Sequence, residues 1–165
     1  MVYSKQTRSK GNRRQGALKG TGEVHTLNDS VTPCIFCQIV ARKSPSLMIF
    51  ENRHVVVILP RAMQAKGHCL IISKRHVADI FDVPVNELAH VASAFKRIAK
   101  LTRKKLGATG VNILHASGAD AQQSVSHLHF HLIPRFPDDG IDAWMSKSSD
   151  QSESRMQIYK LITNG

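Results

Sequence analysis

Apolar residues in the first half of the chain fall into short runs separated by polar segments. Residues 47–50 and 54–59 are two such runs, joined by the polar turn Glu51-Asn52-Arg53, and residues 67–73 are a third. Short runs rich in branched and aromatic residues between polar turns are typical of β-strands. The pattern predicts a β-hairpin followed by a third strand. Residues 34–40 are expected to form a short apolar turn or helix upstream of it.

A different spacing follows residue 82. Between Val85 and Leu106 apolar residues recur every three or four positions, and Lys and Arg gather near the end. This spacing predicts one long helix with a buried face, whose last turn carries the positive charge that a helix dipole favours there. Asp82 is expected to cap the helix, with Pro84 in its first turn and Gly107 just after its last turn.

Residues 127–133 read His-Leu-His-Phe-His-Leu-Ile, so that histidine alternates with an apolar residue. Successive side chains of a strand point to opposite sides, which places His127, His129 and His131 on one face. The opposite face is apolar and is expected to pack into the core. The stretch therefore predicts a half-buried strand with a row of three imidazoles.

These elements indicate an α+β fold, an antiparallel sheet of about five strands with one long helix. Residues 111–115 are expected to supply the fourth strand, and residues 116–126 a loop that leads into the histidine strand. Residues 156–162 are apolar enough for a short docking helix or strand. The expected regions are a flexible basic tail at 1–32, one domain at 33–145 and a C-terminal tail at 146–165.

Composition narrows the class of protein. The 165 residues carry 23 Lys and Arg against 12 Asp and Glu, and residues 1–20 contain no acid at all. Such a tail is either simply solvated or binds nucleic acid through counterion release. No apolar run approaches the length of a membrane span, so we expect a protein without membrane contact. A cytoplasmic location is expected, with an organelle or the nucleus as alternatives.

The chemistry of imidazole gives the histidine row two interpretations. The ring is nucleophilic near neutral pH, exchanges protons there and binds metals in its neutral form. Cys34-x-x-Cys37 adds two thiols at a spacing that suits zinc, whereas three cysteines in total do not indicate a disulfide framework. The residues alone leave a metal site and a covalent-catalysis site both open.

The chain resembles the histidine triad (HIT) family over about residues 34–135. The motifs that carry the resemblance are, in order, Cys34-Ile35-Phe36-Cys37, Gly67-His68, Ile71-Ile72-Ser73-Lys74-Arg75-His76, Gln123-Ser124-Val125 and the row from His127 to His131. The resemblance implies the HIT fold, usually a homodimer, and a purine nucleotide as ligand. It also implies hydrolysis or transfer through a nucleotidyl-histidine intermediate, on nucleoside phosphoramidates or dinucleoside polyphosphates.

The resemblance also implies roles for individual residues. His129 matches the nucleophile, and His131, His68 and Ser124 match the other catalytic residues. Gln123 matches a residue that hydrogen-bonds the phosphate. The residues that match the apolar pocket for the base are Ile35, Phe36, Ile39, Ile58 and Leu59.

In members of the family that carry both cysteines, the ligands of a structural zinc correspond here to Cys34, Cys37, His76 and His127. A closed Cys2His2 tetrahedron is structural rather than catalytic, and it would leave the other two histidines of the row free. A pair of reduced thiols is the alternative. No organic cofactor is implied.

Two positions depart from the family's pattern. The Asp that holds the ribose hydroxyls falls on Pro60, next to Arg61, and the Asn eleven residues before the first histidine of the row falls on Ala116. Either Arg61 recruits a more anionic substrate or the ribose is held differently. The departures favour a second hypothesis, a nucleotide-binding or regulatory protein with little activity. The basic tail suggests a third, a nucleic-acid deadenylase resembling aprataxin.

Overall fold

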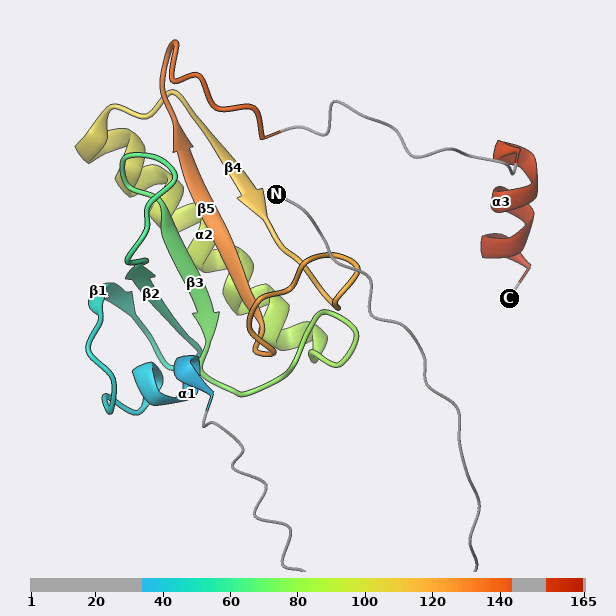
Figure 1. Cartoon of the computed structure of the whole chain (residues 1–165), viewed down its shortest axis with the longest axis horizontal. Coiled ribbons are helices and arrows are strands. Elements are labelled where there is room, and N and C mark those ends of the chain that lie inside the picture. Colours follow the sequence, from blue (N-terminus) through green and yellow to red (C-terminus); the bar gives the residue numbers. More distant parts are fainter. Residues whose placement is uncertain (1–33, 144–153, 165) are drawn as a thin grey trace, which may run out of the picture. The chain divides into compact units, whose positions relative to one another are not determined.

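The computed structural model describes residues 34–143 and 154–164, so the predicted basic tail lies outside the described residues. The elements, in chain order, are α1 (Ile35–Val40), β1 (Leu47–Glu51), β2 (Val55–Leu59), β3 (Cys69–Ser73), α2 (Val85–Leu106), β4 (Gly110–Leu114), β5 (His129–Arg135) and α3 (Arg155–Thr163) (Figure 1). Within the described residues, none of these helices is long and apolar enough to cross a membrane. The apolar stretch at residues 156–162, for which a helix or a strand was expected, lies in helix α3.

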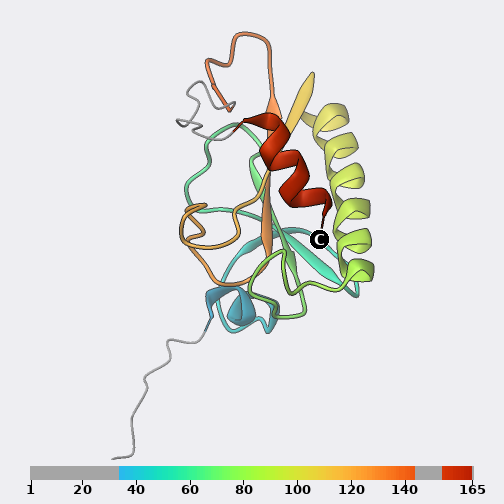
Figure 2. The same ribbon diagram turned by 90° about the vertical axis from the view of Figure 1, so that its right-hand side faces the viewer.

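The five strands form one antiparallel sheet in the order β1-β2-β3-β5-β4. This confirms the predicted α+β fold. Helix α2 lies along one face of the sheet, as the turned view in Figure 2 shows. Residues Val91, Ala94 and Ile98 of α2 pack there against β2, β3 and β5. Phe36 and Ile39 of α1 pack on the other face of the sheet.

Burial on both faces explains why β2 and β3 read as unbroken apolar runs. Val55 and Val57 point toward α2, whereas Val56 and Ile58 point toward α1. A strand that is covered on both sides has no solvent face on which to place polar residues. The central strands therefore form a rigid platform, and the histidine strand β5 pairs directly with β3.

The long helix begins later than the sequence suggested. Asp82 does not cap it; Pro84 occupies the N-cap position in an extended conformation, and its carbonyl accepts from the amide of Glu87 at 2.9 Å. The residue before a proline is disfavoured in the helical region, which prevents Val83 from starting the helix. The other end is as predicted, because Gly107 follows the last turn with φ 77°.

The histidine strand also begins later than predicted, at His129. Leu128 lies just before it, and its amide donates to the carbonyl of Val77 at 2.7 Å instead of joining the β3–β5 ladder. The predicted alternation holds nevertheless. Leu128, Phe130 and Leu132 are all buried in the core under α2.

The loop between β4 and β5 is fixed by the side chain of Gln123. Its carbonyl oxygen accepts from the amide of Gly118 at 2.8 Å, and its Nε2 donates to the carbonyls of Ala78 at 2.7 Å and Val125 at 3.1 Å. These bonds connect the loop to itself and to the segment that follows β3. The amide group of Gln123 is thus fully engaged with backbone.

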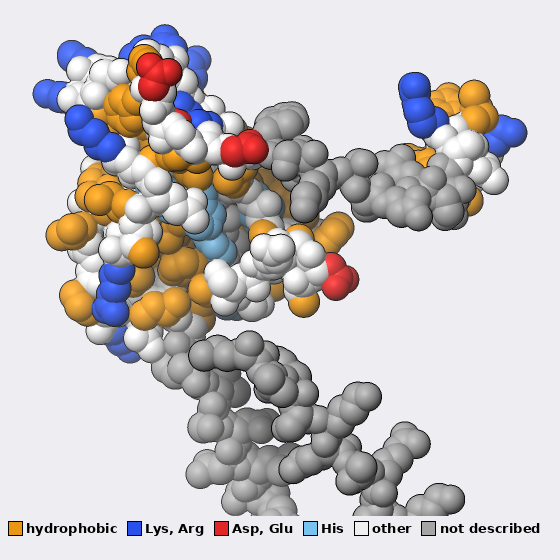
Figure 3. Space-filling view, turned by 45° about the horizontal axis from the view of Figure 1, so that its top comes forward, with side chains coloured by type: hydrophobic (Ala, Val, Ile, Leu, Met, Phe, Trp, Pro, Cys, Tyr) orange, Lys and Arg blue, Asp and Glu red, His pale blue; other side chains and the backbone are white. Residues whose placement is uncertain are grey.

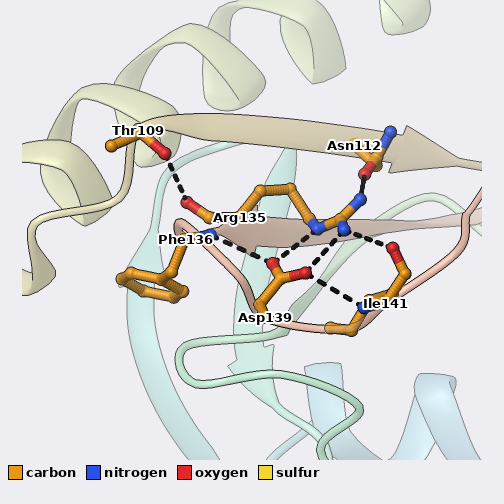
Figure 4. Close-up of polar contacts among 6 residues, drawn as sticks. All are labelled: Thr109, Asn112, Arg135, Phe136, Asp139 and Ile141. Carbon is orange, nitrogen blue, oxygen red and sulfur yellow. Dashed lines mark hydrogen bonds and ion pairs between the residues drawn. The ribbon is translucent and has the colours of Figure 1, made fainter.

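The end of β5 is fixed by Arg135 (Figure 4). Its guanidinium donates to both carboxylate oxygens of Asp139, at 2.8 and 2.7 Å, and to Oδ1 of Asn112 on β4 at 2.6 Å. Asp139 also accepts from the amides of Phe136 and Ile141, each at 3.0 Å. These donors, Arg135 first, hold the pKa of the Asp139 carboxyl well below its ordinary value.

We expect Gln123→Ala to lower the free energy of unfolding by about 1–3 kcal/mol, because it leaves three backbone groups, two in the loop and one in the segment after β3, without their partner. Denaturant unfolding measures this difference. Gln122→Ala is the matched control, since Gln122 is exposed, and its effect is expected to stay within about 0.5 kcal/mol. Equal losses in the two variants would show that the amide of Gln123 does not hold the loop.

We expect the stabilisation by Asp139 to depend on pH. Its pKa is lower in the folded chain, so its contribution is present in full above about pH 5 and decreases as the pH falls toward the folded-state value. Thermal melts of Asp139→Asn should therefore lie several degrees below those of the parent at pH 7 and approach them at acid pH. Asp138→Asn is the neighbouring control, for which no such difference is expected.

Candidate functional site

His129 and His131 of the predicted row lie on β5, which pairs with β3, and His127 lies just before β5. In Figure 3 histidine side chains form a pale-blue strip on one face of the molecule, bordered by hydrophobic side chains. The strand register places His129 opposite Ile72 and His131 opposite Leu70, while His68 lies just before β3. His129 and His68 are only 6% and 2% exposed, and His131 is half-buried. The structure thus brings together the three histidines predicted to be catalytic.

The surroundings of His129 define its protonation. Its Nδ1 lies 2.7 Å from the backbone carbonyl of His127, which only accepts, so Nδ1 carries the proton. Burial lowers the pKa of His129, and the nearby His115 lowers it further. The ring is therefore neutral at neutral pH, with an unshared electron pair on Nε2. Such a nitrogen is a competent nucleophile.

The opposite tautomer follows for His131 from a chain of two hydrogen bonds. The amide of Gln64 donates to Nδ1 of His68 at 3.2 Å, so the proton of neutral His68 is on Nε2. That Nε2 lies 3.0 Å from Nδ1 of His131 and donates to it. His131 therefore carries its own proton on Nε2. Burial first, and then His129 and His68, lower the pKa of His131 to about 4, so that it donates as a neutral ring.

An apolar cavity of about 640 Å³ adjoins the histidines. The ring of Phe36 separates the cavity from His129. It lines the cavity and also contacts the ring of His129, with 4.9 Å between centroids. All five residues predicted for a base pocket line this cavity, namely Ile35, Phe36, Ile39, Ile58 and Leu59. Pro60 and Arg61 lie on its wall as well.

Two cysteines and two histidines gather near Phe36, whose ring contacts that of His127, and their ligand atoms all lie within 4.8 Å of one another. Nδ1 of His127 is 3.4 Å from Sγ of Cys34 and 3.5 Å from Sγ of Cys37. Nδ1 of His76 is 3.2 Å from Sγ of Cys37 and 3.1 Å from Nδ1 of His127. Ligands around one zinc ion lie roughly 3.3–3.8 Å apart at the corners of a tetrahedron.

The hydrogen bond of the other ring nitrogen of His127 also supports a zinc site. Nε2 donates to the backbone carbonyl of Ser73 at 2.8 Å, which leaves Nδ1 as the unprotonated nitrogen facing the thiols. A hydrogen bond of this kind orients a metal-binding imidazole and fixes its tautomer. The residues present therefore fit a zinc ion in donor type, spacing and protonation. The third cysteine, Cys69, lies apart in the core, where burial raises its pKa to about 12.

The remaining predicted residues differ in how they are placed. Ser124 is exposed, and no described residue hydrogen-bonds its hydroxyl. Gln123, predicted to hydrogen-bond the phosphate, has its amide engaged with the loop backbone. A nucleotide would have to displace one of those bonds to reach it.

Sequence reasoning missed His115, which directly follows β4. Its Nδ1 lies 2.8 Å from the carbonyl of His129, and its Nε2 lies 2.7 Å from the hydroxyl of Ser117. Its ring also stacks on Phe130 with 4.3 Å between centroids. The residues flanking Ala116 thus connect the loop to the backbone of His129, although Ala116 itself has no polar side chain. The pairing of the strand at 111–115 with the histidine strand was the signal that could have found His115.

Comparisons with known protein families, sequences and structures all point to one family. The HIT domain family model matches residues 41–138. Adenosine 5′-monophosphoramidase from Saccharomyces cerevisiae is 34% identical over 119 residues, which cover 71% of this chain and 73% of the yeast protein.

Two crystal structures are similar as well. A zinc-bound histidine triad family protein from Mycobacterium smegmatis is 36% identical, with a TM-score of 0.65 over 67% of this chain and 81% of that one. A HIT family member from Bacillus subtilis is 32% identical, with a TM-score of 0.70 over 80% and 96%. The family model covers more than half of the chain, and the chain belongs to the HIT family.

Proposed function

We propose that this protein cleaves purine nucleoside 5′-phosphate derivatives by forming a covalent nucleotidyl intermediate on His129. The observation that carries the proposal is the complementary protonation of two adjacent rings. His129 presents an unshared pair on Nε2, and His131 presents a proton on its own Nε2. The centroids of the two rings are 5.4 Å apart, so both reach one phosphate group.

In the first step, Nε2 of His129 attacks the α-phosphorus, a P–N bond forms and the bond to the leaving group breaks. His131 donates a hydrogen bond from Nε2 to the phosphate or to the departing group, where negative charge develops. The proton of His129 stays on Nδ1, and its hydrogen bond to the carbonyl of His127 stabilises the ring as it becomes positive. In the second step, water attacks the same phosphorus and the P–N bond to His129 breaks. This releases the nucleoside monophosphate, gives one proton of the water to solvent and restores neutral His129.

The first substrate class to test is the nucleoside phosphoramidates, because a relative 34% identical to this chain is an adenosine 5′-monophosphoramidase. Dinucleoside polyphosphates are the alternative within the same mechanism. A second candidate function is nucleotide binding with little turnover, which Pro60 and Ala116 favour because neither offers a polar side chain. A homodimer, nucleic-acid binding through the basic tail and a cytoplasmic location stay predictions.

We also propose that Cys34, Cys37, His76 and His127 hold a structural zinc ion, since a similar protein from Mycobacterium smegmatis is zinc-bound and the four ligand atoms converge here. When bound, the ion supplies a cross-link rather than reaction chemistry. The contacts of His127 explain how such a cross-link would serve the site. His127 gives a thiol-facing nitrogen to this cluster and its carbonyl to His129, so the cluster supports the nucleophile's position.

We expect His129→Ala to lower the turnover rate by about a thousandfold or more, while AMP binding persists. Intact-protein mass spectrometry after a brief quench that avoids acid should show one added nucleoside monophosphate on the parent chain alone. Substrates are adenosine phosphoramidate and diadenosine polyphosphates. His90→Ala is the control, because it removes a half-buried histidine that stacks on His54 away from the row. Turnover in His129→Ala equal to the parent's would contradict the proposal.

We expect the purified chain to contain one zinc ion per molecule, measured by inductively coupled plasma mass spectrometry. Cys34→Ser with Cys37→Ser should lose the ion and melt at a lower temperature, because a cross-link between α1 and the segment before β5 is removed. Cys69→Ala is the control for loss of a thiol outside the cluster. A zinc-free chain whose melting temperature does not respond to a chelator would refute the zinc site.

A further inference from the structure

The cavity beside His129 has one charged side chain on its wall, and that charge is positive. Its described lining is mainly apolar, with the hydroxyls of Ser44 and Ser46 and the guanidinium of Arg61 as its polar side chains. Among the described residues no carboxylate lines it. A neutral nucleoside would satisfy the apolar walls but would leave the guanidinium without a partner.

Arg61 has no acidic partner among the described residues, in contrast to three other basic residues near the sheet. Arg42 and Lys74 both pair with Glu51, and Arg135 pairs with Asp139. The side chain of Arg61 is exposed and forms no hydrogen bond or ion pair with any described residue. An unpaired guanidinium at the edge of an apolar cavity is a strong site for an anion, because it binds phosphate with two parallel hydrogen bonds.

The position of Arg61 indicates which part of a nucleotide would carry that anion. The 5′-phosphate belongs at His129 and His131, and the flat base belongs between the apolar walls near Ile39 and Ile58. Arg61 follows directly after Leu59 and Pro60 at the end of β2, and Phe36 connects the same cavity to His129. In such a pose the ribose joins the base to the 5′-phosphate, and Arg61 is the charged side chain on the cavity wall that can meet a group on its hydroxyls. Pro60 offers its hydroxyls no side-chain acceptor.

We propose that Arg61 binds a second phosphate, a monoester on the 2′- or 3′-hydroxyl of the ribose, so that the preferred ligand is a nucleoside bisphosphate derivative. This inference rests on the proposed function, because the 5′-phosphate must lie at the histidines. Arg61 is then a specificity-determining residue. It distinguishes ribose-phosphorylated nucleotides from AMP by charge, and the apolar walls hold the base in both.

Calorimetric titration of the full chain tests this with three probes, namely AMP, adenosine 2′,5′-bisphosphate and adenosine 3′,5′-bisphosphate. One bisphosphate is expected to bind about tenfold more tightly than AMP, which equals about 1.4 kcal/mol. The comparison of the two isomers decides which hydroxyl carries the recognised group. The preference is expected to weaken as the salt concentration rises.

Arg61→Gln should bring the affinity for the preferred bisphosphate close to the affinity for AMP. Lys66→Gln is the matched control, because it removes an exposed positive charge from the same loop, 5.7 Å from the ring of Phe136, and should keep the preference. Arg61→Lys should retain part of it, since lysine keeps the charge but loses the paired geometry.

Three results would overturn the inference. Equal affinity of the parent chain for AMP and both bisphosphates would do so while leaving the proposed function intact. An unchanged ratio in Arg61→Gln, with all affinities lowered together, would assign Arg61 to the base or the 5′-phosphate instead. Failure of every nucleotide to bind would remove the proposed function as well.

Discussion

His127 connects three parts of the molecule through its two ring nitrogens and its carbonyl. Nδ1 faces the thiols beside α1, and Nε2 donates to the carbonyl of Ser73 at the end of β3. The carbonyl of His127 accepts a hydrogen bond from Nδ1 of His129. Because His127 is fully buried, each of these groups must be paired. The position and protonation of the candidate nucleophile therefore depend on a residue that itself does no chemistry.

Burial determines the protonation state of the other histidines of the site. Desolvation disfavours the charged imidazolium, so His68, His129 and His131 are neutral at neutral pH. Neutral rings have one donor and one acceptor each, and the partner of one nitrogen decides the state of the other. A backbone carbonyl makes His129 an acceptor at Nε2, whereas the Gln64 amide, acting through His68, makes His131 a donor.

The sequence predicted much of this arrangement, because alternating and helical periodicities are local. The sheet, the long helix, the buried apolar face of residues 128–132 and the convergence of the four predicted zinc ligands all agree with the structure. Asp82 was wrong as a cap, since the proline after Val83 shifted the helix start. His115 was missed because its partner is a backbone carbonyl on another strand, and only the β4–β5 register reveals it.

The segment from Pro60 to Gly67 contributes both to the cavity and to the row of histidines. At its start it carries Arg61 on the cavity wall, and near its end the amide of Gln64 sets the tautomer of His68 and thereby of His131. Its backbone therefore joins the charged part of the cavity wall to the hydrogen bonds that determine which nitrogen of His131 carries the proton. A substitution that displaces this short segment therefore alters the wall of the cavity and the proton donor together.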